Sequence, residues 1–198
     1  SFPSGHSTNS MLTYGSVARY LKKKPITIAA IIIIFCVGVS RFCVGAHYPT
    51  DVLCGWALGL ICMFLMPWVS SKFKREWVLY VILLVLALPG FFYCTSNDFY
   101  TSYGMMLGGF TGFLFEEKYV KFENTRNVLQ IILRVVIGGA LFFGLNTAFK
   151  LPFSEEFLES GVTAALLVRM FRYAIVIFLL IGVYPMLFKV MDKIGKKK

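Results

Sequence analysis

Long runs of apolar residues dominate the chain and alternate with short polar and charged stretches. Of its 198 residues, 58% are hydrophobic and 15% are charged, whereas a soluble domain carries about a quarter charged residues. Because a helix needs about 20 mainly apolar residues to cross a bilayer, we predict an all-α, polytopic transmembrane helical bundle of about seven spans. The predicted spans are residues 6–21, 26–43, 49–68, 77–94, 103–117, 128–149 and 166–188.

The basic residues give the predicted spans an orientation. The net charge is +10, and 14 of the 20 Lys and Arg residues fall on alternate loops and on the C-terminal tail. Short loops rich in Lys and Arg stay on the cytoplasmic side of a membrane. We therefore expect the C-terminus to be cytoplasmic and residues 95–102 to be extracytoplasmic. The 14 residues are Lys22, Lys23, Lys24, Lys72, Lys74, Arg75, Lys118, Lys121, Arg126, Lys189, Lys193, Lys196, Lys197 and Lys198. Since these charges mark topology, we expect membrane lipids as partners and no nucleic acid.

Small residues recur at helical spacing in two of the spans. Gly104, Gly108 and Gly112 are four positions apart, as are Gly55 and Gly59. Such ridges let two transmembrane helices approach closely.

The five cysteines form no Cys-x-x-Cys pair, and four of them lie in apolar segments. We therefore expect the cysteines to be small core residues rather than metal ligands or disulfides.

Two motifs contain the two histidines of the chain. The first is Pro3-Ser4-Gly5-His6, and the second is Ser40-Arg41-x5-His47-x3-Asp51. Ionisable residues at a membrane boundary cost free energy and are functional by default. The predicted topology places both motifs at the extracytoplasmic face, and Pro49 suits the first turn of the third span. Two helix N-termini would then direct backbone N–H groups at one site, which favours an anion.

These two motifs resemble the second and third signature motifs of the type 2 phosphatidic acid phosphatase (PAP2) superfamily. The resemblance covers residues 3–51 and implies that His47 is a nucleophile forming a phosphohistidine. It further implies that Asp51 orients His47 and that His6 is the general acid. The remaining motif residues would bind the phosphoryl oxygens: Ser4, Gly5, Ser40 and Arg41. No metal or cofactor is expected, because the sequence lacks the carboxylate cluster that Mg²⁺ requires.

The resemblance also suggests a division of the chain. Residues 1–70 would form the second half of a six-helix catalytic core, and residues 71–198 a four-span region of unknown role. The first family motif, a Lys and an Arg-Pro, is absent from these 198 residues. It normally lies upstream of Pro3, so we expect an N-terminally truncated chain.

The function implied is an integral membrane lipid phosphatase, which we expect in a bacterial plasma membrane. Candidate substrates are undecaprenyl diphosphate, phosphatidylglycerol phosphate, phosphatidic acid and sphingoid phosphates. A catalytically idle lipid-phosphate binding or transport protein is the alternative. A nucleophile, an acid and an orienting carboxylate together argue against that alternative, because binding alone needs only arginine and backbone N–H groups. The soluble haloperoxidases of the superfamily do not fit so apolar a chain.

Several polar residues leave two interpretations open. Ser7, Thr8, Asn9 and Ser10 could line the site or satisfy hydrogen bonds from helix to helix. Arg169 and Arg172, three positions apart, could reach a lipid phosphate. Pairing with Glu155, Glu156 or Glu159, or extension of the side chain to the membrane interface, is favoured for these two arginines.

Overall fold

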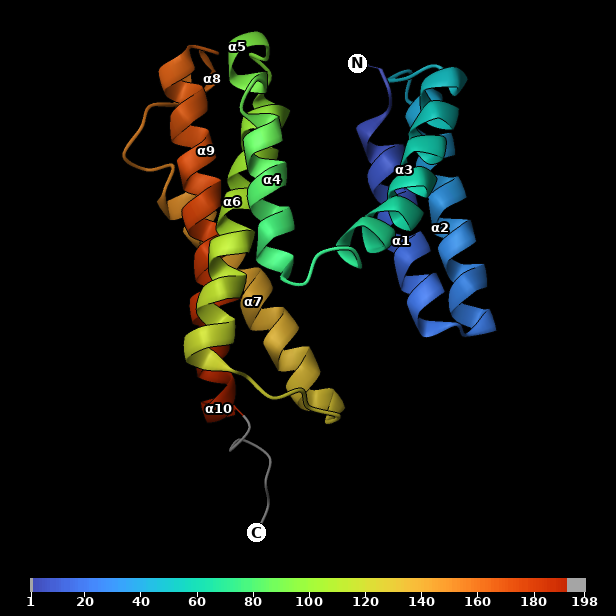
Figure 1. Ribbon diagram of the computed structural model, residues 1–198. Coiled ribbons are helices and arrows are strands. Elements are labelled where there is room, and N and C mark those ends of the chain that lie inside the picture. Colours follow the sequence, from blue (N-terminus) through green and yellow to red (C-terminus); the bar gives the residue numbers. More distant parts are fainter. Residues whose placement is uncertain (1, 192–198) are drawn as a thin grey trace. The chain divides into compact units, whose positions relative to one another are not determined.

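Each of the seven predicted segments is helical in the computed structural model, which describes residues 2–191 (Figure 1). The long helices are α1 Gly5–Leu21, α2 Lys24–Cys43, α3 Pro49–Ser70, α4 Glu76–Ala87, α6 Asn97–Phe115, α7 Val128–Ala148 and α9 Thr163–Phe178. Short elements are α5 Gly90–Tyr93, the π-helices η1 Glu116–Val120 and η2 Leu179–Val183, α8 Glu155–Glu159, the 3₁₀-helix η3 Tyr184–Leu187 and α10 Phe188–Met191. The all-α polytopic class is confirmed.

Five stretches of the described chain are long and apolar enough to cross a membrane. They are Lys24–Cys43, Pro49–Ser70, Glu76–Tyr93, Val128–Ala148 and Thr163–Met191. The other two predicted spans, α1 and α6, do not reach this length and hydropathy, since α1 has 17 residues and α6 begins with polar residues. The predicted count of seven membrane spans is therefore approximate. The predicted tail residues Lys193, Lys196, Lys197 and Lys198 lie outside the described residues.

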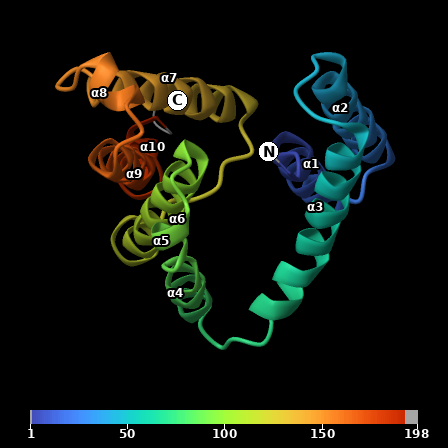
Figure 2. The same ribbon diagram turned by 90° about the horizontal axis from the view of Figure 1, so that it is seen from above.

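The chain divides into two compact units, Ser1–Lys74 and Arg75–Lys198. In the first unit, α1 packs against both α2 and α3 (Figure 2). A Cβ atom on Gly55 or Gly59 would lie 2.7 Å from the carbonyl oxygen of Ser4 or Thr8. The predicted close approach at these two glycines is confirmed, and it fixes the start of α1 against α3.

In the second unit, α6 lies along α9 and continues beside η2 (Figures 1 and 2). A Cβ atom on Gly104 or Gly108 would overlap the carbonyl oxygen of Met170 or Ala174. The predicted glycine ridge is therefore the contact surface of this helix pair. Gly112 continues it, since its Cβ would lie 3.1 Å from Ile181 Cβ.

The helix α6 begins at Asn97, earlier than the predicted start at residue 103. Ser96 caps it, because the Ser96 hydroxyl accepts a hydrogen bond from the Phe99 N–H at 3.3 Å. Asp98 in the first turn adds a favourable charge at the helix N-terminus. Hydropathy alone places the start of this helix later, because its first residues are polar and interrupt the apolar run.

Large apolar side chains cover the outer surfaces of both units. Examples among the exposed residues are Ile31, Ile32, Leu86, Val135 and Val136. Such surfaces are stable in hydrocarbon and not in water, so the protein is integral to a membrane. The prediction of core positions was wrong for Cys36, Cys43 and Cys54, which are exposed on these surfaces.

Candidate functional site

His47 and Asp51 are adjacent at the start of α3. The His47 Nδ1 atom lies 3.4 Å from Asp51 Oδ2, and the side chains are 11% and 15% exposed. The same Oδ2 accepts a hydrogen bond from the Tyr48 N–H at 3.0 Å. Pro49 begins the helix, so Asp51 occupies its third position and caps the N-terminus with its carboxylate. With a proton on Nδ1 donated to Asp51, the Nε2 lone pair of His47 is free for a reaction.

The turn between α2 and α3 determines where His47 lies. The Arg41 carbonyl accepts hydrogen bonds from the N–H groups of Ala46 and His47, at 3.0 and 3.2 Å. Gly45 has a φ of +71°, a backbone conformation that a residue with a Cβ rarely adopts. The five-residue spacer between Arg41 and His47 is thus folded back onto the end of α2.

The side chains of Ser40 and Arg41 are linked to each other. The Ser40 hydroxyl donates to the Val37 carbonyl at 2.7 Å and accepts from Arg41 Nε at 3.2 Å. Within residues 2–191, the terminal nitrogens of Arg41 make no hydrogen bond and no ion pair. This end of the guanidinium is therefore available for an anion, and Ser40 holds the other end.

A backbone hydrogen bond joins the two histidine motifs. The Ser4 N–H donates to the Asp51 carbonyl at 3.1 Å, so the start of α1 is fixed to the first turn of α3. The N-terminal end of the first unit and its α2–α3 turn accordingly lie at one end of that unit (Figure 1). All seven residues singled out in the two motifs are at this end.

Ser4 is the N-cap of α1. Its side chain is fully buried and accepts hydrogen bonds from the Ser7 hydroxyl at 3.0 Å and the Ser7 N–H at 3.5 Å. Gly5 and His6 follow and are exposed, and nothing lies within 4 Å of a Cβ placed on Gly5. The helix N-terminus is therefore open at Gly5, where a phosphate oxygen could approach the backbone. A contact between the Ser4 hydroxyl and a phosphoryl oxygen stays a prediction.

The polar residues that follow His6 mostly satisfy the helix itself. Ser7 and Ser10 are buried, and the Ser10 hydroxyl donates to the Ser7 carbonyl at 3.0 Å. The Thr8 hydroxyl donates to the Ser4 carbonyl at 3.0 Å. These hydrogen bonds lie within α1 and do not join two helices, so the predicted helix-to-helix bonds are not seen for these three residues. That these residues line the site stays a prediction. Asn9 is exposed.

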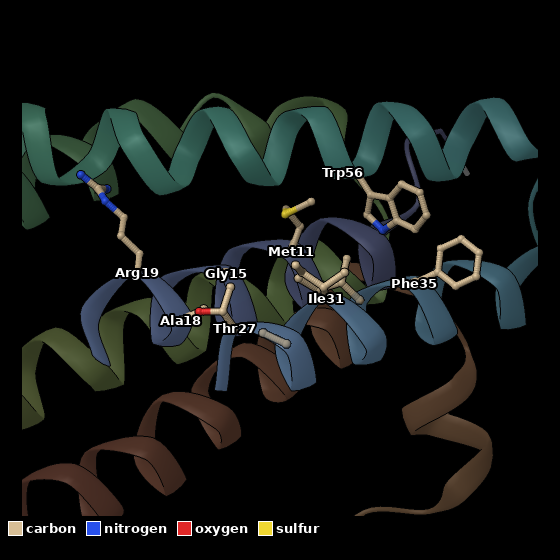
Figure 3. A pocket seen from close by; sticks show the side chains of 10 residues that line it. Met11, Gly15, Ala18, Arg19, Thr27, Ile31, Phe35 and Trp56 are labelled. Atoms are coloured by element: carbon tan, nitrogen blue, oxygen red, sulfur yellow. The ribbon is translucent and has the colours of Figure 1, made fainter. Parts of the chain in front are cut away.

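An apolar cavity lies elsewhere in the same unit, and none of the motif residues lines it. Its volume is about 470 Å³, and α1, α2 and α3 all contribute to its wall, including Met11, Ile31 and Trp56 (Figure 3). Arg19 is the charged residue in its lining. Such a cavity can accept a hydrocarbon chain, and neither histidine of the chain lines it. Among the described residues, no three His, Cys, Asp or Glu side chains form a group able to hold a metal ion.

The favoured interpretation of Arg172 was wrong. Its side chain is 5% exposed, so it does not extend to the membrane interface. No ion pair joins it or Arg169 to a glutamate in the part of the chain that the structure describes. The sequence could not predict this burial, because it arises where α7, α8 and α9 meet.

Comparisons with known proteins find sequence matches in both units. Residues 1–75 match the family described as the PAP2 superfamily, and residues 100–197 match "PAP2 superfamily phosphatase, transmembrane extension". The chain is similar to phosphatidylglycerophosphatase B of Bacillus subtilis (strain 168), with 42% identity over 84 residues. That match covers 38% of this chain and 41% of the relative, so the chain spans less than half of that protein. No solved structure matches the chain.

Proposed function

Because the chain belongs to the PAP2 superfamily of membrane phosphatases, we propose that it hydrolyses a lipid phosphate or diphosphate through a phosphohistidine intermediate at the extracytoplasmic face. The observation that carries this proposal is the pairing of His47 with Asp51 at 3.4 Å. It rests also on the Ser4–Asp51 hydrogen bond, which ties the Pro3-Ser4-Gly5-His6 motif to that pair.

In the proposed first step, His47 Nε2 attacks the phosphorus atom of the lipid phosphate. The bond from phosphorus to the lipid oxygen breaks, and His6 donates a proton to the leaving alkoxide. Asp51 accepts the Nδ1 proton in a hydrogen bond, which fixes the tautomer and stabilises the positive charge that develops on the ring. The products of this step are a phosphohistidine and a lipid alcohol.

In the second step, water attacks the phosphohistidine. His6, now neutral, removes a proton from that water, the bond between phosphorus and Nε2 breaks, and inorganic phosphate is released. Arg41 would bind the equatorial oxygens in both steps, since its terminal nitrogens carry no other hydrogen bond in the described chain. The Gly5 N–H would bind another oxygen. Ser40 and Ser4 would hold Arg41 and the start of α1 in position, with Ser4 also a candidate phosphate ligand.

We propose that the reaction needs no divalent cation. Arg41 and the exposed N-termini of α1 and α3 supply positive charge where Mg²⁺ would otherwise be required. The proposed extracytoplasmic placement rests on the basic residues of alternate loops. In a bacterial plasma membrane, a lipid in the outer leaflet would then present its phosphate at the depth of His47.

The substrate to test first is phosphatidylglycerol phosphate, because a relative with 42% identity over 84 residues is named phosphatidylglycerophosphatase B. Phosphatidic acid, undecaprenyl diphosphate and sphingoid phosphates are the comparison substrates. Release of inorganic phosphate by the purified protein in lipid nanodiscs measures the activity. Preference for one of these lipids, lost in His47→Ala, supports the proposal.

The alternative is an idle lipid-phosphate binding protein. It predicts that the protein retains lipid phosphate without releasing inorganic phosphate, and that His47→Ala leaves lipid retention unchanged. Acid-labile labelling of the protein by a ³²P-labelled lipid phosphate separates the two functions. Labelling of the parent protein but not of His47→Ala supports catalysis. If the parent protein neither becomes labelled nor releases phosphate, the proposed catalytic function is contradicted.

A further inference from the structure

A second, polar cavity lies within the C-terminal unit. Its volume is about 370 Å³, and its wall comes from the end of α7, the segment after it, α8 and α9. Three cations and two carboxylates line it: Lys150, Arg169, Arg172, Glu155 and Glu159. Neither histidine of the chain is in this unit, and no residue of the His47 site lines the cavity.

Arg172 is the unusual member of this cavity. Its side chain is 5% exposed, yet the Nε and Nη1 atoms have no hydrogen-bond partner in the described chain. The Arg172 guanidinium carbon lies 5.3 Å from the centre of the Tyr173 ring. Burial of these two nitrogens without an acceptor is nevertheless costly, because their hydration is lost and no hydrogen bond replaces it. The cost is removed when an anion occupies the cavity that Arg172 lines.

Arg169 strengthens this interpretation. It lies three positions before Arg172, so the two side chains share one face of α9. Lys150 joins them from the segment after α7. Two guanidinium groups and an ammonium group around one cavity offer several donors to the oxygens of a phosphate group.

The two glutamates do not neutralise this cluster. Neither Glu155 nor Glu159 forms an ion pair with Lys150, Arg169 or Arg172 within 4.0 Å among the described residues. Both glutamates are exposed, so water hydrates their carboxylates, whereas Arg172 is buried. The cavity retains an excess of one positive charge.

From these observations we propose that the C-terminal unit holds a second, non-catalytic site for a phosphate group, with Arg172 as its buried ligand and Arg169 and Lys150 beside it. The apolar side chains of Leu151, Phe153 and Leu158 in the same wall suit the glycerol part and upper chain of a phospholipid. The phosphate group can belong to a lipid headgroup or to free phosphate, and the two sources are distinguished by experiment.

The test uses the whole chain carrying Arg41→Gln, which weakens phosphate binding at the first site, in dodecyl maltoside micelles, because this detergent has no phosphate group. One arm titrates inorganic phosphate and follows the thermal unfolding midpoint. The other arm adds phosphatidylglycerol to the micelles and counts the retained phosphatidylglycerol per protein by native mass spectrometry. The test variant is Arg172→Gln, and the matched control is Arg126→Gln, which removes one exposed arginine from the same unit.

We expect Arg172→Gln to weaken binding by about tenfold or more, which corresponds to loss of one charge-assisted contact. Arg126→Gln should bind as the parent does. A loss confined to the phosphatidylglycerol arm identifies a lipid headgroup site, whereas a loss in the phosphate arm identifies a site for free phosphate.

Equal binding by the parent and Arg172→Gln in both arms overturns the proposal, as does an absence of binding by the parent. If Arg172→Gln fails to fold, Arg169→Gln and Lys150→Gln carry the same prediction. Unchanged binding in both of these variants would equally overturn it. Since every protein in this test lacks Arg41, the outcome is independent of whether the His47 site is catalytic.

Discussion

The Arg19 side chain donates a hydrogen bond to α3 that Pro67 cannot donate. Arg19 Nη1 donates a hydrogen bond to the Met63 carbonyl at 2.8 Å. In an uninterrupted helix that carbonyl would accept from the N–H of residue 67, but proline has no N–H. The guanidinium carbon also lies 4.5 Å from the centre of the Phe64 ring. One charged residue of α1 therefore binds α3 at the position where the α3 hydrogen-bond ladder is broken.

Arg19→Ala should destabilise the protein by about 1–3 kcal/mol, because a carbonyl in an apolar region loses its donor. The same substitution should cost less in a Pro67→Ala background, where the restored N–H can satisfy Met63. Denaturant unfolding in detergent micelles of the four proteins in this cycle measures the coupling. An equal cost of Arg19→Ala in both backgrounds would show that Pro67 does not create the need for Arg19. Lys22→Ala, an exposed residue at the end of the same helix, serves as the control.

The His47–Asp51 pair makes a graded prediction for activity. His47→Ala should lower kcat by about 10⁴-fold or more, since the proposed nucleophile is removed. Asp51→Asn should retain some activity, because the ring remains but its tautomer is no longer fixed by a carboxylate. Thr50→Ala, at an exposed position between them, should behave as the parent protein does. Phosphate release measures all three, and near-normal turnover by His47→Ala would exclude it as the nucleophile.

Chelation tests the proposed independence from metal. Turnover should persist in excess EDTA, because Arg41 and the helix N-termini provide the positive charge at the phosphoryl group. Vanadate should inhibit by adopting a trigonal-bipyramidal geometry on His47 that imitates the transition state. Vanadate binding should disappear in His47→Ala. Activity that is lost in EDTA and restored only by Mg²⁺ would contradict this mechanism.

The glycine ridge of α6 predicts a difference between two similar substitutions. Gly108→Ala should destabilise by about 1–3 kcal/mol, because the new methyl group overlaps the Ala174 carbonyl and the helices must separate. Gly144→Ala in α7 should cause no loss, since nothing lies within 4 Å of its Cβ position. Alanine is also the better helix former. Thermal unfolding in micelles, followed by circular dichroism, compares the two. Equal midpoints would show that the α6–α9 contact tolerates a side chain.

Local patterns made the helices and the glycine contacts predictable from the sequence. Apolar runs of about 20 residues and four-residue glycine spacing are properties of single segments, and both appear in the structure. The contact of Arg19 with Met63 was not predictable, because it joins residues 44 positions apart through a defect at Pro67. The burial of Arg172 was likewise not predictable, because it depends on residues distant in the sequence. Its surroundings come from three helices, whereas its sequence neighbours suggested a residue near the membrane surface.

The orientation of both units can be tested by cysteine labelling in a cysteine-free background. Ala46→Cys lies in the exposed turn that carries His47, and Asn97→Cys lies at the exposed start of α6. Lys74→Cys lies in the basic segment after α3, which we predict to be cytoplasmic because short basic loops resist translocation. In intact cells, a membrane-impermeant maleimide should label positions 46 and 97, and position 74 should react only after permeabilisation. Labelling of position 74 alone would reverse the orientation and place the His47 site at the cytoplasmic leaflet. Labelling of position 97 without position 46 would contradict the placement of the His47 site on the extracytoplasmic side while leaving that of the C-terminal unit intact.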